Sequence, residues 1–293
     1  MNHKYDVSHL KYYLSQTGWY LQHFSRILRD PSGYFAYRRF IRKMKTATGA
    51  YGMSGTVFRN PCGASSYSSI TPHSLSILGI NAVKNEEILR MWACYTLQLQ
   101  IYGKNSRTIQ ISNNVLYAGE PIMKSWLLGG KSGSWFDNRA HLFLCEINHE
   151  KVIISVMSKD KYDFDHIYQI GADLCERVSS GATGEFLQHL IHSRGGYSIY
   201  NLTKQQYHEE HNQFSTFIPG SVTKIMTALI ALGSKLPMDE WLTVHPIDLQ
   251  EGSGSTFYPG DKICFHDALY AMMMESSNTL AHVIARSVGY RLK

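Results

Sequence analysis

The chain lacks any apolar run long enough to cross a bilayer, for which about 20 consecutive apolar residues are needed. Residues 1–6 lead into charged and aromatic residues, without the apolar core of a signal peptide. As the sequence stands, we therefore expect a cytoplasmic protein. An extracytoplasmic location would require a route of export that this sequence does not reveal.

Cysteines are few and carry no pairing pattern. Their number is odd, they are widely spaced and no two form a C-x-x-C pair: Cys62, Cys94, Cys145, Cys175 and Cys264. The histidines show no H-x-x-x-H or comparable ligand spacing. These absences argue against a disulfide framework and fit a reducing compartment. We expect no metal and no cofactor.

The chain also lacks a concentrated surplus of charge. Its net charge of +6 comes from lysines and arginines spread along 293 residues, so we expect no nucleic-acid partner. The densest basic run, residues 38–45, carries apolar residues at helical spacing and is interpreted as a solvated helix face. A hydrophobic content of 44% is typical of a folded globular protein.

Apolar periodicity predicts helices at both ends of the chain and strands between them. The predicted strands begin near residue 108, around Ile109, Ile111, Val115 and Leu116, and residues 127–133 are expected to end in a glycine-rich turn. Hairpins are predicted for residues 141–147 with 151–157 and for 197–202 with 206–210. Helices are predicted over residues 4–30, 34–46 (closed by Gly49), 71–78, 85–97, 164–178, 266–273 and 279–288. The pattern favours an α/β layer beside a helical lobe.

The most informative stretch is residues 218–232, a Pro-Gly turn followed by an apolar helix. Ser221 and Lys224 lie in its first turn, three residues apart and thus on one helical face. An amine so placed can take the proton of the serine hydroxyl, and the free N–H groups of the helix end favour negative charge nearby. A lone S-x-x-K is common by chance, and the alternative is an N-cap serine followed by an exposed lysine.

Two further motifs favour the catalytic interpretation. S-x-x-K, S-D-N and K-T-G together mark penicillin-binding proteins and class A β-lactamases. This chain has variants of the second and third in residues 276–278, Ser-Ser-Asn, and 131–133, Lys-Ser-Gly. With residues 219–232, 258–262 and 267–270 around them, they make the chain similar to serine D-alanyl-D-alanine carboxypeptidases of the penicillin-binding protein and β-lactamase superfamily. Taken singly, the second motif could merely cap the last helix and the third could be an ordinary turn.

The resemblance implies a role for each residue. Ser221 would be the nucleophile that forms an acyl-enzyme and Lys224 its base. Ser276 would relay a proton to the leaving group, and Asn278 would hold the substrate amide and the lysine. Lys131 would supply positive charge, assisted by the Ser132 hydroxyl, while Gly133 would let a substrate lie against the strand. The oxyanion hole would be the backbone N–H groups of Ser221 and Ser134.

The order of the motifs differs from that of the family, in which K-T-G comes last, and circular permutation is the simplest account. Residues 56–63 and 71–78 resemble the family segments after the S-x-N helix, and residues 126–178 its final strands and terminal helix. The hairpin of residues 197–212 resembles the strands before the serine helix. Residues 33–178 would then be the permuted carboxyl-terminal half and 197–293 the amino-terminal half of one catalytic domain. Residues 179–196 would join them, and residues 1–32 would be an added helix.

The resemblance implies an α/β fold of the α+β type, with an antiparallel sheet flanked by helices beside a helical lobe. The implied function is a serine D-alanyl-D-alanine carboxypeptidase acting on D-amino-acid-containing peptides and binding β-lactams. The absent export signal is the main objection, because peptidoglycan lies outside the membrane. The alternatives are a cytosolic amidase, esterase, β-lactamase or peptide cyclase, or a catalytically silent binding protein. Residues 1–30 are a candidate contact between copies of the chain.

Several residues depart from the family pattern or compete with it. Glu275, Ser277 and Thr279 stand where the family commonly has proline, glycine and aspartate, so substrate choice is open. No deacylating glutamate motif of the class A type is present, which weakens the β-lactamase alternative. Cys62 is a second conceivable nucleophile, but the sequence places no base near it and a buried or loop thiol is expected.

Overall fold

The computed structural model describes residues 30–159, 164–182 and 195–292. The predicted helix of residues 4–30 lies, apart from its last residue, outside this part of the chain, as do most of the proposed linker and the candidate contact between copies. The helices are α2 (Pro31–Ala50), α3 (Pro72–Ala82), α4 (Glu86–Ala93), α5 (Asn114–Met123), α6 (Phe164–Ser180), α8 (Thr223–Gly233), α9 (Phe265–Met274) and α10 (Asn278–Arg291). Short 3-10 turns are η1 (Lys124–Trp126), η2 (Gly220–Val222) and η3 (Pro246–Asp248).

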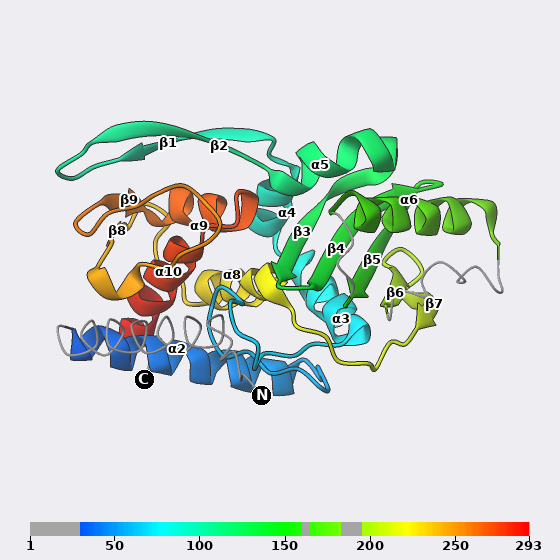
Figure 1. The fold of residues 1–293 in the computed structure, drawn as a ribbon, viewed down its shortest axis with the longest axis horizontal. Helices are drawn as coiled ribbons and strands as arrows, with labels where there is room; N and C mark the ends of the chain where they lie inside the picture. Colours follow the sequence, from blue (N-terminus) through cyan, green and yellow to red (C-terminus); the bar gives the residue numbers. More distant parts are fainter. Residues whose placement is uncertain (1–29, 160–163, 183–194, 293) are drawn as a thin grey trace, which may run out of the picture.

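A five-stranded sheet forms one half of the molecule (Figure 1). Its order is β3-β4-β5-β6-β7 and every neighbouring pair is antiparallel. The strands are β3 (Leu127–Trp135), β4 (Asn138–Ile147), β5 (Glu150–Ser158), β6 (Gly196–Asn201) and β7 (Gln206–His211). Two small ribbons complete the strands: β1 (Thr96–Ile101) with β2 (Arg107–Ser112), and β8 (Trp241–Thr243) with β9 (Lys262–Cys264). Helices flank antiparallel sheets, which confirms an α+β fold class.

Both faces of the large sheet are covered by helices. α6 and α5 pack over one face, where aromatic and aliphatic side chains such as Phe143 and Tyr168 form a core of their own. α3 covers the other face, and its side of the sheet is continuous with the core of the helical lobe. Strands β4 and β5 are apolar on both sides because both of their faces are buried, as their near-continuous burial shows.

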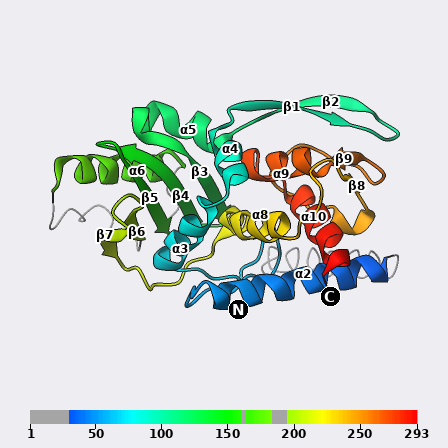
Figure 2. The same ribbon diagram turned by 180° about the vertical axis from the view of Figure 1, so that it is seen from behind.

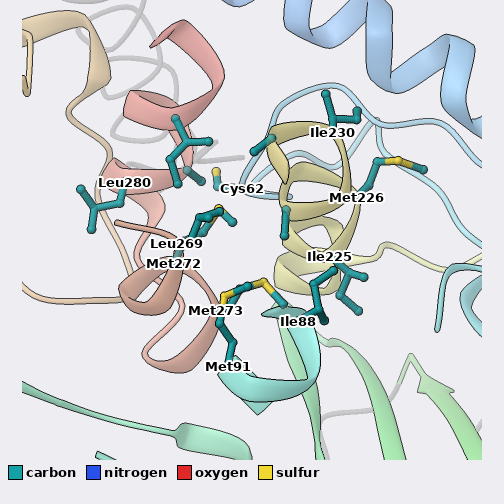
Figure 3. Packing of buried hydrophobic residues seen from close by; sticks show 14 of the residues in the cluster. Cys62, Ile88, Met91, Ile225, Met226, Ile230, Leu269, Met272, Met273 and Leu280 are labelled. Atoms are coloured by element: carbon teal, nitrogen blue, oxygen red, sulfur yellow. The ribbon is translucent and has the colours of Figure 1, made fainter. Parts of the chain in front are cut away.

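The helical lobe is built around α8, which lies between the sheet and α10 (Figures 1 and 2). Methionines and branched aliphatic residues from α4, α8, α9 and α10 interdigitate there, with Met91, Ile225, Met273 and Leu280 among them (Figure 3). Methionine fills irregular gaps between helices because its side chain is unbranched and flexible. α8 is apolar on nearly every side, so the first turn of that helix is held firmly in place.

α10 slants down onto α2 and packs against it in both views (Figures 1 and 2). Near the start of α2 and the end of α10, Ser32 Oγ lies 3.3 Å from Tyr290 Oη. Arg39 Nε donates to the carbonyl oxygen of Gly289 at 2.9 Å. The helix that begins the described chain is therefore packed against the helix that ends it.

The two hairpins, α3, α6, α9 and α10 confirm the sequence-based predictions closely, but four other predictions were wrong. The predicted helix of residues 85–97 stops at Ala93, and Thr96 begins β1. Val115 and Leu116 lie in α5 rather than in a strand. Residues 127–133 are the greater part of β3, not a turn. Gly49 does not close a helix, because α2 continues through Ala50.

Within the described residues, no helix combines the length and the apolar character that crossing a membrane requires.

Candidate active site

Ser221 sits in the turn η2 that leads into α8. Gly220 adopts φ of +52°, a left-handed conformation that glycine tolerates best, and the chain then enters the helix directly. Lys224, one turn on, is fully buried, whereas Ser221 is half-exposed. The Lys224 amine lies 2.7 Å from Ser221 Oγ. The i, i+3 spacing thus produces the hydrogen-bonded pair that was predicted.

The Lys224 amine also reaches three other oxygens. It lies 2.8 Å from Asn278 Oδ1, 3.1 Å from the Cys62 carbonyl oxygen and 3.3 Å from Ser276 Oγ. Burial lowers the pKa of Lys224 to about 8. A neutral amine fits this set of partners well, since its two N–H groups serve Asn278 and Cys62 while its lone pair accepts the Ser221 hydroxyl.

Lys131 reaches the same place from β3. Its side chain is fully buried, and its Nζ donates to Ser276 Oγ and to the Ser132 carbonyl oxygen, both at 3.0 Å. Burial, and then the nearby charge of Lys224, hold the pKa of Lys131 well below its ordinary value. In the described part of the chain neither amine pairs with a carboxylate. The site is therefore short of negative charge.

Ser276 is the residue that the two lysines share. Its backbone has φ of +67°, an uncommon value for a residue other than glycine, and its side chain is almost wholly buried. The next residue, Ser277, caps α10 by accepting from the Leu280 N–H at 3.3 Å. Asn278 begins that helix and donates from Nδ2 to the Glu251 carbonyl oxygen at 2.9 Å. The helix-capping interpretation of this motif therefore holds for Ser277, while Ser276 and Asn278 face the lysines.

The edge strand β3 directly touches the turn that carries Ser221. A side chain at Gly133 would bring Cβ within 2.8 Å of Ser221 N and 2.4 Å of the Pro219 carbonyl oxygen. A side chain at Gly220 would bring Cβ within 2.7 Å of Ser134 N. Glycine at position 133 is therefore required by this close packing, and the residue also lines the cleft described below.

A cleft of about 490 Å³ opens in front of these groups. Five predicted residues line it, namely Ser221, Ser276, Ser132, Gly133 and the exposed Ser134. The opposite wall comes from residues that the sequence patterns did not indicate: Asn114, Tyr117 and Ala118 of α5, Tyr168 of α6 and Ser253 of a loop. An N-cap signal at Asn113, whose Oδ1 accepts from the Val115 and Leu116 N–H groups, could have revealed α5.

Cys62 lies behind the site rather than in the cleft. Its thiol is 1% exposed, burial raises its pKa, and only its backbone carbonyl reaches Lys224. The structure does place a histidine beside it, because His282 Nε2 lies 3.7 Å from the sulfur. A substrate in the cleft would meet Ser221 first. The expected buried thiol is confirmed.

One group of side chains among the described residues has the composition of a metal site. Potential ligand atoms of Cys264, His266 and Asp267 lie within 4.8 Å of one another. They stand at the start of α9, where the helix dipole disfavours a cation, and His266 Nδ1 already contacts Asp267 Oδ1 at 2.8 Å. None of the three lines the cleft.

Comparisons of the chain with protein-family models, with curated proteins and with solved structures found no match.

Proposed function

We propose that the chain is a serine acyl-transferring hydrolase with a circularly permuted penicillin-binding fold, and that it acts as a D-alanyl-D-alanine carboxypeptidase. The observation that carries the proposal is the convergence of three motifs on one point. Ser221 Oγ, Lys131 Nζ and Ser276 Oγ are connected through hydrogen bonds of 2.7 to 3.3 Å that include Lys224. Residues 145 positions apart in the chain take part. Chance matches to short motifs would not be expected to meet in this way.

The chemistry follows from the arrangement. The neutral Lys224 amine takes the proton of Ser221 as Oγ bonds to the carbonyl carbon of the substrate. Backbone N–H groups of Ser221 and Ser134 stabilise the oxyanion. Ser276 gives its hydroxyl proton to the departing amine as the C–N bond breaks and takes the proton held by Lys224 in exchange, which leaves an ester on Ser221 and a neutral Lys224. Water then attacks the ester carbon and gives a proton to Lys224, which returns it to Ser221 Oγ as the C–Oγ bond breaks and the carboxylic acid product leaves.

The shortage of negative charge at the site favours a substrate that carries a carboxylate. Two lysines share Ser276 without a carboxylate partner among the described residues. A substrate with a terminal carboxylate would supply the missing counter-charge next to Lys131, and a penicillin carboxylate would do the same. The serine hydroxyls on β3 can hold that group in place.

The packing of α2 on α10 supports the permutation. In a permuted domain, the two new ends lie where a continuous chain once ran. The 3.3 Å contact of Ser32 with Tyr290 joins the start of one helix to the end of the other, as a former connection would. Strands β3 to β5 and the later hairpin β6–β7 share one sheet, which supports a single domain built from both chain halves.

The proposal is tested with a labelled penicillin and intact-mass measurement, with Ser221→Ala as the control. We expect a single adduct in the wild-type protein and none in the variant. Absence of any serine-dependent adduct with all penicillins and acyl esters tried would overturn the enzyme assignment and favour a binding protein. Release of D-alanine from a pentapeptide separates a carboxypeptidase from an amidase, an esterase, a β-lactamase or a cyclase with the same machinery.

A further inference from the structure

The turn that carries Ser276 is held against the loop of residues 250–255 by hydrogen bonds and close packing. Asn278 N donates to the Ser253 carbonyl oxygen at 3.1 Å, and the Gln250 N–H donates to Thr279 Oγ1 at 3.2 Å. Gly254 packs so closely that a Cβ there would lie 2.5 Å from Ser277 Cα. Through this loop Ser253 reaches the cleft.

Glu275, the residue before Ser276, binds the other end of this loop at Ser255. Its Oε1 accepts from the Ser255 N–H at 2.9 Å and its Oε2 from the Ser255 hydroxyl at 2.8 Å. Its backbone carbonyl oxygen accepts from Asn114 Nδ2 at 3.3 Å, and Asn114 belongs to the opposite wall of the cleft. A single residue therefore contacts the loop and α5.

The position of Glu275 matters because Ser276 follows it in a left-handed conformation. Such a conformation costs roughly 1–3 kcal/mol in a residue other than glycine and persists only where its surroundings enforce it. Hydrogen bonds of Asn278 hold Ser276 on its carboxyl-terminal side, and those of Glu275 hold it on the other. Burial raises the pKa of the Glu275 carboxyl, while its bonds from Ser255 act in the opposite direction.

We infer that Glu275 is a positioning residue whose carboxylate clamps Ser255 and thereby holds both Ser276 and Ser253 in their working places. The carboxylate touches neither lysine and takes no part in the reaction. Its effect passes through the backbone of Ser276 and through the loop. The inference rests on the proposed function, because acylation of Ser221 is the reaction that a correctly placed Ser276 serves.

Three variants separate the clamp from a general loss of structure. Glu275→Ala removes both hydrogen bonds, and Ser255→Ala removes only the one from the hydroxyl. Glu275→Gln can rebuild both, since its amide oxygen accepts from the Ser255 N–H and its amide N–H donates to the hydroxyl. Glu86→Ala is the matched control, because that glutamate side chain is 86% exposed.

The first readout is the acylation rate with a fluorescent penicillin, resolved into binding and the first-order step. We expect Glu275→Ala to lower the first-order step about 10- to 100-fold, as small displacements near reacting groups do. Ser255→Ala should show a smaller loss, and Glu275→Gln should stay within about threefold of the wild type if its two bonds reform. An unchanged first-order step in Glu275→Ala would overturn the inference.

The second readout does not depend on activity. Hydrogen exchange of the amides in residues 250–256 should become about tenfold faster in Glu275→Ala and stay at the wild-type rate in Glu86→Ala. Unchanged exchange in Glu275→Ala would mean that no clamp exists. A wild-type protein that forms no adduct would contradict the proposed function instead, and exchange would still test the clamp. If Glu275→Ala does not fold, Ser255→Ala decides by the same two measurements.

Discussion

Ser32 Oγ lies 3.3 Å from Tyr290 Oη, although 258 positions separate the two residues. If this contact marks a former connection between the two helices, the order of the chain segments can be changed without loss of folding or activity. A variant in which residues 196–292 come first, followed through a short Gly/Ser linker by residues 30–182, should fold with a melting temperature close to that of the parent. It should also acylate with penicillin at a similar rate. Thermal unfolding and intact mass test this.

A reordered chain that aggregates or fails to acylate would contradict the permutation, provided that the same linker appended to the parent chain is harmless.

Lys224 predicts how the reaction depends on pH. Burial lowers the pKa of its amine to about 8, and only the neutral amine can accept the Ser221 proton. Below that pKa the neutral fraction rises about tenfold for each pH unit, so the acylation rate constant should climb with that slope between about pH 5 and about pH 7 and level off above about pH 8. Stopped-flow acylation with a fluorescent penicillin measures the profile. A flat profile, with circular dichroism unchanged over the range, would rule out Lys224 as the base.

Variants of Ser276 can separate the cost of its left-handed backbone from the role of its hydroxyl in acylation. Ser276→Ala and Ser276→Gly both lose the hydroxyl shared by the two lysines, so each should acylate about 100-fold more slowly than the wild type. Their stabilities should differ, because glycine adopts φ of +67° freely and alanine does not. Chemical denaturation should find the glycine variant about 1 kcal/mol more stable than the alanine variant. Equal stabilities would mean that the turn relaxes once the hydroxyl is gone.

Gly133 predicts a steric effect on catalysis. In Gly133→Ala the new methyl group would lie 2.8 Å from Ser221 N, so β3 and the turn that carries Ser221 must separate. We expect the acylation rate to fall by about 100-fold or more, together with a lower melting temperature. The control is Gly49→Ala in α2, where the methyl group meets nothing within 4 Å and should stabilise the helix by about 0.5–1 kcal/mol. Wild-type acylation by Gly133→Ala would show that the close contact is unnecessary.

The sequence patterns predicted those helices and strands whose apolar residues follow a clear helical or strand pattern within one segment. Both hairpins of the large sheet were found because clear turn residues separate their strand-forming segments. β3 was missed because Gly129 and Gly130 resemble a turn, whereas they lie in the strand with φ near +150°, in close contact with Trp92 and Leu142. Such contacts join distant segments, and no local pattern contains them.

The candidate site could be predicted only in part for the same reason. Ser221, Lys224, Ser276, Asn278 and Lys131 belong to short motifs that can be found in sequence. Asn114, Tyr117 and Ser253 line the cleft through tertiary packing alone, and α5 was interpreted as a strand. The clamp of Ser255 by Glu275 likewise joins a loop to a helix end that lie 20 positions apart.

The late position of α10 in the chain also bears on how the protein is made. Lys131 belongs to a strand synthesised early, yet its partner Ser276 follows 145 positions later. While the chain grows on a ribosome, strands β3 to β5 have neither the hairpin β6–β7 beside them nor the turn whose Ser276 hydroxyl contacts Lys131. The proposed catalytic centre therefore cannot assemble during most of synthesis. A nascent chain stalled before residue 276 would leave Lys131 of the edge strand β3 without its Ser276 partner.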